Sequence, residues 1–104
     1  MSRGILTFDY VVVGAGTSGC VVARRLAENG LHTVALLEAG PESATPTLKV
    51  PHGYLSLLKS KKYDWLYTTE ADENINFRRV EWPRGKVLGG SSAVNALVYV
   101  RGQR

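Results

Sequence analysis

The chain has 104 residues, of which 44% are hydrophobic and 21% are charged, and its 13 Lys and Arg outnumber its 9 Asp and Glu. This length allows one small domain, and this composition is typical of a globular protein rather than a disordered or membrane-embedded one. The formal charge of +4 is modest and its basic residues are scattered. We therefore interpret them as solvated surface and expect no nucleic-acid partner.

Cysteine usage and hydropathy exclude further classes. Cys20 is the only cysteine, so no internal disulfide can form and an oxidising compartment gains no support. The amino terminus has too short an apolar stretch for a signal peptide, and no apolar run reaches the roughly 18 residues that a membrane span needs. We expect a cytoplasmic protein without a membrane span, and we leave open both peripheral membrane association of a longer parent and the oligomeric state.

The first predicted element is a buried strand over Tyr10–Val13 that breaks into a glycine-rich turn. The turn reads Gly14-Ala15-Gly16-Thr17-Ser18-Gly19, which is the G-x-G-x-x-G spacing. Gly14 lets the chain turn sharply out of the strand, and Gly16 lets the backbone approach a pyrophosphate. Gly19 lets the following helix pack closely on the sheet. The turn therefore predicts a phosphate site.

A helix is predicted over residues 17–29. Val22 and Leu26 lie four residues apart on its predicted inner face, with alanines beside them, and Gly30 is a suitable stop. The first N–H groups of such a helix are unpaired and lie at the positive end of its dipole, so a phosphate beside Thr17 and Ser18 would satisfy both.

A second apolar run over residues 33–37 predicts a parallel strand beside the first, with both strands buried on both faces. It ends in Glu38, 19 positions after Gly19. A carboxylate there can accept hydrogen bonds from ribose hydroxyls and would repel a 2'-phosphate, which favours FAD or NAD over NADP. The glycine spacing alone also occurs by chance, and Glu38 alone fits a solvated carboxylate. Together with both strands and the helix they predict a dinucleotide-binding unit.

The middle of the chain predicts smaller elements. Residues 39–46 predict a loop that could lie across the nucleotide, and residues 51–60 predict a short amphipathic packing helix. Residues 63–69 and 77–82 are aromatic and β-prone, and a polar connection between them predicts an antiparallel hairpin. We assign its aromatic rings to the core rather than to a substrate cage.

The other informative stretch is residues 83–102. Gly89 and Gly90 give a backbone able to approach a ligand, and Ser91 and Ser92 can cap a helix that begins immediately after them. From the residues alone, this stretch is either a second ligand-binding turn or only a tight turn before a buried element.

Three motifs, in this order, resemble the glucose-methanol-choline (GMC) family of FAD-dependent oxidoreductases. They are Leu36-Leu37-Glu38-Ala39-Gly40, Tyr63-Asp64-Trp65 and Arg84-Gly85-Lys86-Val87-Leu88-Gly89-Gly90-Ser91-Ser92-Ala93-Val94-Asn95. The resemblance covers nearly all of residues 8–102 and looks like the bacterial choline dehydrogenase-like branch. It implies an α/β fold: a Rossmann-like FAD-binding βαβ unit with an appended β-hairpin and short helices. Residues 1–104 would be the amino-terminal part of an FAD-binding domain, with the substrate domain absent.

The resemblance also implies the cofactor-binding residues. The FAD pyrophosphate would lie on Gly14, Gly16, Thr17, Ser18 and Gly19, and the adenosine ribose on Glu38. The matching positions of the second motif, chiefly near the flavin half, are Val87, Gly90, Ser91, Asn95, Ala96, Leu97 and Val98. Some family members attach the flavin through a histidine at the position of Val94. Valine cannot form that bond, so we expect non-covalent FAD.

The activity that the resemblance implies is oxidation of a small-molecule alcohol, choline-like or other, by hydride transfer to the flavin. The family's catalytic histidine lies near the carboxyl terminus, in a region with no counterpart here, and neither His32 nor His52 matches it. We therefore assign no catalytic residue and no metal ligand, and we expect an amino-terminal fragment that is inactive alone. The alternatives are a stand-alone dinucleotide-binding module without catalysis and a partner-binding domain whose glycines serve only packing.

Overall fold

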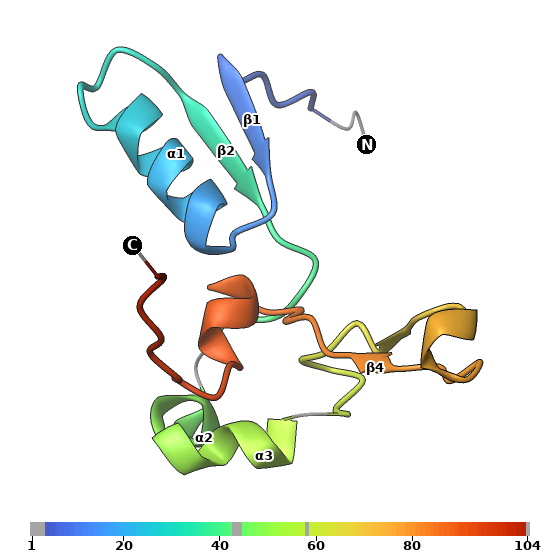
Figure 1. The fold of residues 1–104 in the computed structure, drawn as a ribbon. Helices are drawn as coiled ribbons and strands as arrows, with labels where there is room; N and C mark the ends of the chain where they lie inside the picture. Colours follow the sequence, from blue (N-terminus) through green and yellow to red (C-terminus); the bar gives the residue numbers. More distant parts are fainter. Residues whose placement is uncertain (1–3, 43–44, 58, 104) are drawn as a thin grey trace.

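The computed structural model describes residues 4–42, 45–57 and 59–103 (Figure 1). Its helices and strands are, in order, β1 (Tyr10–Val13), α1 (Thr17–Ala27), β2 (Val34–Leu37), α2 (Pro46–Lys49), α3 (Tyr54–Leu57), β3 (Tyr67–Thr68) and β4 (Glu81–Trp82). Short 3₁₀ turns lie at Pro51–Gly53, Glu73–Ile75 and Gly90–Ala93. The predicted α/β fold class is confirmed.

The β1–α1–β2 unit has the predicted topology. β1 and β2 pair in parallel, with Tyr10 opposite Val34 and Val13 opposite Leu37, and α1 covers one face of this sheet (Figure 1). The helix ends at Ala27, two residues before the predicted end. The chain then turns at Gly30, whose φ of +69° is left-handed and whose N–H bonds the carbonyl of Ala27 at 3.0 Å. Gly30 is therefore the predicted stop.

Small residues bring α1 against the sheet. A Cβ on Gly19 would collide with the carbonyl oxygen of Gly14, so only glycine allows this approach. Ala23 is buried on the same stripe, and Leu26 is half-buried. The prediction that Val22 faces the sheet is wrong, because it lies beside this stripe and is 48% exposed.

The prediction that both strands are buried on both faces is also wrong for the described chain. Val11, Val13 and Leu37 are 56%, 81% and 53% exposed. Among the described elements, α1 is the one that packs on this sheet, and it covers only one face. The apolar character that predicts two-sided burial therefore lies on an open face.

Two predictions for the connection after β2 need correction. The loop predicted over 39–46 is confirmed for residues 39–42 and 45, but it ends one residue early because α2 begins at Pro46, where the hydroxyl of Thr45 accepts the N–H of Thr47 at 3.3 Å. The single helix predicted over 51–60 is a 3₁₀ turn followed by α3. Val50 separates α2 from this turn because a residue before proline is pushed into extended conformation. Residues 43–44 and 58 of these predictions lie outside the described residues.

The predicted hairpin is confirmed, with shorter strands than expected. β3 and β4 pair antiparallel, with Tyr67 opposite Trp82. In the turn between them, the carboxylate of Asp72 accepts the N–H of Asn74 at 2.9 Å. The assignment of the aromatic rings to the core is wrong, because Trp65, Tyr67 and Trp82 are 42%, 53% and 48% exposed.

The core of the second half is small. Leu57, Val87 and Val94 are buried together, with Leu48 and Tyr63 packed against them. The chain as a whole is open: it exposes 8619 Å², whereas a closely packed protein of its mass exposes about 5,800 Å². Its radius of gyration is 17.6 Å, against about 13 Å for a compact domain of this length.

The two parallel strands are fastened at their start by Asp9. Its carboxylate accepts the N–H and the hydroxyl of Thr33 at 2.7 and 2.8 Å. In return, the N–H of Asp9 donates to the hydroxyl oxygen of Thr33 at 3.1 Å. Hydrogen bonds from the backbone and side chain of Thr33 hold the pKa of Asp9 below its ordinary value.

We predict that Asp9→Asn lowers the Tm at neutral pH and removes part of the acid sensitivity of the fold. A carboxyl group with a lowered pKa stabilises the folded state above its unfolded pKa of about 3.9, and this contribution disappears as the pH falls through the folded pKa. Circular-dichroism melts at neutral pH and at several pH values below about 4 measure both effects. Identical acid dependence in the wild type and the variant would contradict the prediction.

Candidate cofactor site

The two glycine-rich turns, far apart in the sequence, lie against each other. Ala15, in the first turn, is fully buried, and its carbonyl oxygen accepts the N–H of Gly89 at 2.8 Å. A Cβ on Gly90 would come within 2.8 Å of the Cα of Gly16. Figure 1 shows the Gly90–Ala93 turn beside the amino-terminal end of α1. The turns therefore form one continuous surface.

Ser91 and Ser92 brace the second turn, and the prediction that they cap a following helix is wrong. Gly89 and Gly90 have φ of +98° and +60°, so the turn begins at left-handed residues ahead of both serines. The hydroxyl of Ser91 accepts the N–H of Gly85 at 3.0 Å. The hydroxyl of Ser92 donates to the carbonyl of Gly89 at 2.6 Å. Both hydroxyls therefore act within the motif.

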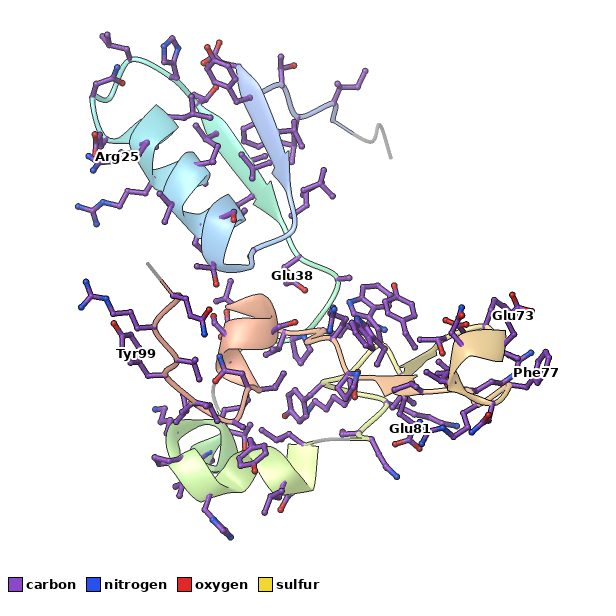
Figure 2. The ribbon with its side chains drawn as sticks, viewed as in Figure 1. Arg25, Glu38, Glu73, Phe77, Glu81 and Tyr99 are labelled. Carbon is purple, nitrogen blue, oxygen red and sulfur yellow. The ribbon has the colours of Figure 1, made fainter. Side chains whose placement is uncertain are left out.

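Glu38 connects the end of β2 to the first glycine turn. One carboxylate oxygen accepts the N–H of Ala15 at 2.8 Å, and the other accepts the N–H of Gly40 at 2.9 Å. Figure 2 shows Glu38 where the sheet unit meets the second half of the chain. Each carboxylate oxygen has a further lone pair, so Glu38 can still accept hydrogen bonds from a ligand.

The first turn of α1 offers donors to an anion. Its first intrahelical hydrogen bond runs from the N–H of Cys20 to the carbonyl of Gly16 at 3.0 Å, and no acceptor among the described residues takes the N–H groups of Thr17 and Ser18. A Cβ on Gly16 would meet only the Cα of Gly90, at 3.9 Å, so the space in front of Gly16 is open. This cradle fits a pyrophosphate. The thiol of Cys20 donates to the carbonyl of Ala15 at 3.2 Å, which agrees with a packing role.

A cavity of about 810 Å³ joins these features and lies within the size range of ligand pockets. Its lining includes the predicted site residues Gly14, Gly16, Glu38, Gly90 and Ser91. Another part of the lining, called the aromatic wall below, is aromatic and basic and is formed by Trp65, Tyr67, Trp82 and Arg84. The structure therefore brings five of the predicted residues together at one cavity.

The aromatic wall was not predicted as part of the site. The rings of Trp65 and Tyr67 stack at a centroid distance of 6.0 Å. The guanidinium of Arg84 lies 5.0 Å from the ring of Trp82, and the ammonium of Lys86 lies 4.9 Å from that of Trp65. The alternation that places Trp65 and Tyr67 on one face, next to a motif with two cations, was the available signal. Assignment of these rings to the core rather than to a substrate cage left them out of the predicted site.

The other predicted site residues lie outside this cavity. Thr17 and Ser18 are exposed in the first turn of α1, whereas Gly19 packs against the turn and Val87 is fully buried in the core. Asn95 and Leu97 line a separate cavity of about 120 Å³. Ala96 and Val98 are exposed in the segment that follows. Contact of these residues with a cofactor stays a prediction.

Within the described ranges 4–42, 45–57 and 59–103, no cluster of three or more His, Cys, Asp or Glu is arranged to hold a metal ion. None of the helices there is both long and apolar enough to cross a membrane. His32 packs edge-on against Tyr10 at a centroid distance of 5.2 Å, away from the cavity lining.

Residues 8–104 match the GMC oxidoreductase family. The chain is 48% identical over 95 residues to an alcohol dehydrogenase [acceptor] of Pseudomonas putida and to an oxygen-dependent choline dehydrogenase of Vibrio vulnificus. Each match covers 91% of this chain and 17% of the relative. The chain therefore spans about 17% of the length of these curated relatives.

Solved structures share the fold. Pyridoxine 4-oxidase from Mesorbium loti superposes with a TM-score of 0.81 and 40% identity, over 92% of this chain and 19% of that one. A mutant of the Aspergillus oryzae formate oxidase, solved for the effect of the mutation on FAD modification, gives a TM-score of 0.74 and 42% identity. That match covers 85% of this chain and 16% of the oxidase.

We predict that Gly90→Ala damages the cavity, whereas Gly30→Ala does not. Both glycines have left-handed φ, so each substitution costs about 1–2 kcal/mol of backbone strain. Only the Cβ at position 90 meets a neighbour, the Cα of Gly16, because no atom lies within 4 Å at position 30. Gly90→Ala should therefore have the lower Tm and bind ADP at least about tenfold more weakly. Melts and calorimetric titrations check this, and equal ADP affinities would contradict it.

Proposed function

We propose that this chain, which belongs to the GMC oxidoreductase family, binds FAD as the amino-terminal part of an FAD-binding domain in an enzyme that oxidises a small-molecule alcohol. The observation that carries the proposal is the contact between the two glycine turns, which gathers the open helix end, Glu38 and the aromatic wall at one cavity. The family match and the relatives named for alcohol and choline support the reaction class.

The adenosine half of FAD would lie at the first glycine turn. The pyrophosphate would accept hydrogen bonds from the free N–H groups at Thr17 and Ser18, in the open space before Gly16. Glu38 would accept ribose hydroxyls with the lone pairs that Ala15 and Gly40 leave unused. The aromatic wall of the same cavity would offer a flat surface for the adenine ring.

The second glycine motif would contact the flavin half of FAD. Gly90 and Ser91 line the same cavity as Glu38, which supports their assignment. Asn95 and the run 96–98 keep their assignment from the resemblance alone. Val94, at the position of the attaching histidine in some members, is buried against Leu57 and Val87, which supports non-covalent FAD.

The division of labour follows from these placements. Bound FAD supplies a flavin ring that accepts a hydride from the alcohol carbon. The residues of this chain bind and orient the dinucleotide, and none of the side chains that line the cavity is a histidine or a cysteine. We therefore assign binding to these residues and no catalytic role.

A second candidate is a dinucleotide-binding module without catalysis. It is favoured by one observation: the helix end, Glu38 and the cavity are all formed by the described residues of this chain. The partner-binding alternative, in which the glycines serve only packing, accounts for Gly40 and Gly85, whose added Cβ atoms would collide with neighbouring backbone. It does not account for Gly16, whose Cβ would face open space.

We predict that Gly16→Ala weakens FAD binding without destabilising the empty protein. Gly16 has φ of −78°, which alanine adopts freely, and the added methyl would meet only the Cα of Gly90 at 3.9 Å. The free energy of unfolding should stay within about 0.5 kcal/mol of wild type, so the Tm should be close to that of wild type. The FAD affinity should fall at least about tenfold, because the methyl occupies the pyrophosphate position.

Titration of the protein with FAD, followed by flavin absorbance and fluorescence, measures this effect. Gly4→Ala is the control, because no atom lies within 4 Å of its Cβ and it is remote from the cavity lining. Unchanged FAD affinity in Gly16→Ala would reject the pyrophosphate position. Absence of FAD uptake by folded wild type would reject the proposed function. Turnover of an alcohol would separate the enzyme from the binding module.

We predict that acid precipitation of the FAD-loaded protein releases the flavin into the supernatant. Val94 offers no nucleophile for a covalent bond to the flavin. The yellow colour of the supernatant and the absence of a fluorescent band on a denaturing gel measure the result. Flavin that stays with the pellet would show a covalent link through another residue.

A further inference from the structure

Asp64 is a buried carboxylate for which the proposed binding of FAD gives no role. It is 5% exposed, and the ion pairs among the described residues do not include it. A buried charge is costly unless hydrogen bonds compensate it. Its environment therefore indicates a function for the carboxylate.

Backbone N–H groups supply the compensation. One oxygen of Asp64 accepts the N–H of Leu66 and the N–H of Arg84, both at 3.0 Å. Burial raises the pKa of Asp64, but the N–H groups of Arg84, Leu66, Lys59 and Trp65 outweigh burial and hold the pKa below its ordinary value. The carboxylate is therefore ionised at neutral pH.

These hydrogen bonds join the two chain segments that form the aromatic wall. Leu66 lies between Trp65 and Tyr67, which both line the cavity, and Arg84 lines it from the segment after β4. The two segments are also joined directly, because the N–H of Trp65 donates to the carbonyl of Arg84 at 2.9 Å. Asp64 therefore lies behind the wall and fastens its two sides.

The backbone that Asp64 holds is strained. Leu66 has φ of +56° and Lys59 has φ of +69°, and left-handed conformation is costly for residues other than glycine. Such conformations persist where the surroundings hold them. The carboxylate accepts the N–H of Leu66 itself. Removal of this acceptor would let the backbone relax and turn the rings of Trp65 and Tyr67.

We propose that Asp64 is a positioning residue for the cofactor cavity, which holds the backbone of Leu66 and Arg84 so that the aromatic wall faces the adenosine half of the ligand. The proposal rests on the proposed function for the identity of the ligand. Asp64 does not line the 810 Å³ cavity, so it acts through Trp65, Tyr67 and Arg84.

The test compares Asp64→Asn and Asp64→Ala with the matched control Asp72→Asn. Asp72 also accepts the N–H of the residue two positions later, Asn74, at 2.9 Å, but it is exposed and lies outside the cavity lining. The chain has 2 Trp, and both line the cavity, so its tryptophan emission reports on the wall. ADP serves as the probe of the adenosine half, titrated calorimetrically well below the Tm.

We expect Asp64→Ala, which removes the oxygen that accepts both N–H groups, to shift the tryptophan emission and to weaken ADP binding about tenfold. Asp64→Asn keeps one acceptor oxygen but loses the negative charge, so we expect it to do both more weakly. Asp72→Asn should change neither. Should Asp64→Ala not fold, Asp64→Asn carries the test, because it keeps the volume and one acceptor oxygen.

Three outcomes would overturn the proposal. The first is an Asp64→Asn protein with a lower Tm but wild-type emission and ADP affinity. The second is an Asp64→Asn protein whose far-UV circular-dichroism spectrum is that of an unfolded chain, because the whole fold would then depend on this carboxylate. The third applies if the wild type does not bind ADP. Tryptophan emission of Asp64→Asn and Asp64→Ala equal to that of wild type would then overturn the proposal. Failure of the proposed function is distinct, since it appears in the wild type as absence of both ADP and FAD binding.

Discussion

The structure depends on the backbone of one residue, Ala15. Its N–H donates to the carboxylate of Glu38, and its carbonyl accepts the N–H of Gly89. The first bond ties the glycine turn to the end of β2, and the second ties it to the second glycine motif. Because Ala15 is fully buried, water cannot replace either bond without cost. These two bonds of the Ala15 backbone hold three segments of the chain together at the cavity, beside the amino-terminal end of α1.

The open face of the sheet follows from the same arrangement. Ala15 and Glu38 fasten the carboxyl ends of β1 and β2 to the second half of the chain, and the rest of the sheet extends away from it (Figure 1). Val11 and Val13 are therefore left on an uncovered face, which accounts for part of the large exposed area. Contiguous exposed apolar surface of this kind is typical of interaction surfaces. The packing of this unit is therefore one-sided, because α1 covers one face of the sheet and the other face carries exposed valines.

The sequence predicts what short-range physics decides. β1, α1 and β2 were predicted to within two residues, because the glycine spacing, the helical period and Gly30 each act within a few residues. Long-range packing decides the rest. Nothing local distinguishes Ala23 from Val22 as the inward residue, and nothing local shows that Trp65 lines a cavity. Of the site, Gly16 and Glu38 were predictable from spacing. Asp64 was not, because an aspartate before an aromatic residue gives no signal of burial.

Glycine shows most clearly why spacing alone cannot identify a ligand site. Gly19, Gly40 and Gly85 would each drive an added Cβ into neighbouring backbone, so their absence of a side chain serves packing. Gly16 has room for a methyl group in the empty protein and lies at the end of a helix with free donors. Packing does not explain the missing side chain at Gly16. The proposed phosphate position would explain it, because a side chain there would occupy the space of the phosphate. The same distinction separates Gly90, whose added Cβ would meet the neighbouring turn at 2.8 Å, from Gly16, whose added Cβ would meet its nearest atom at 3.9 Å.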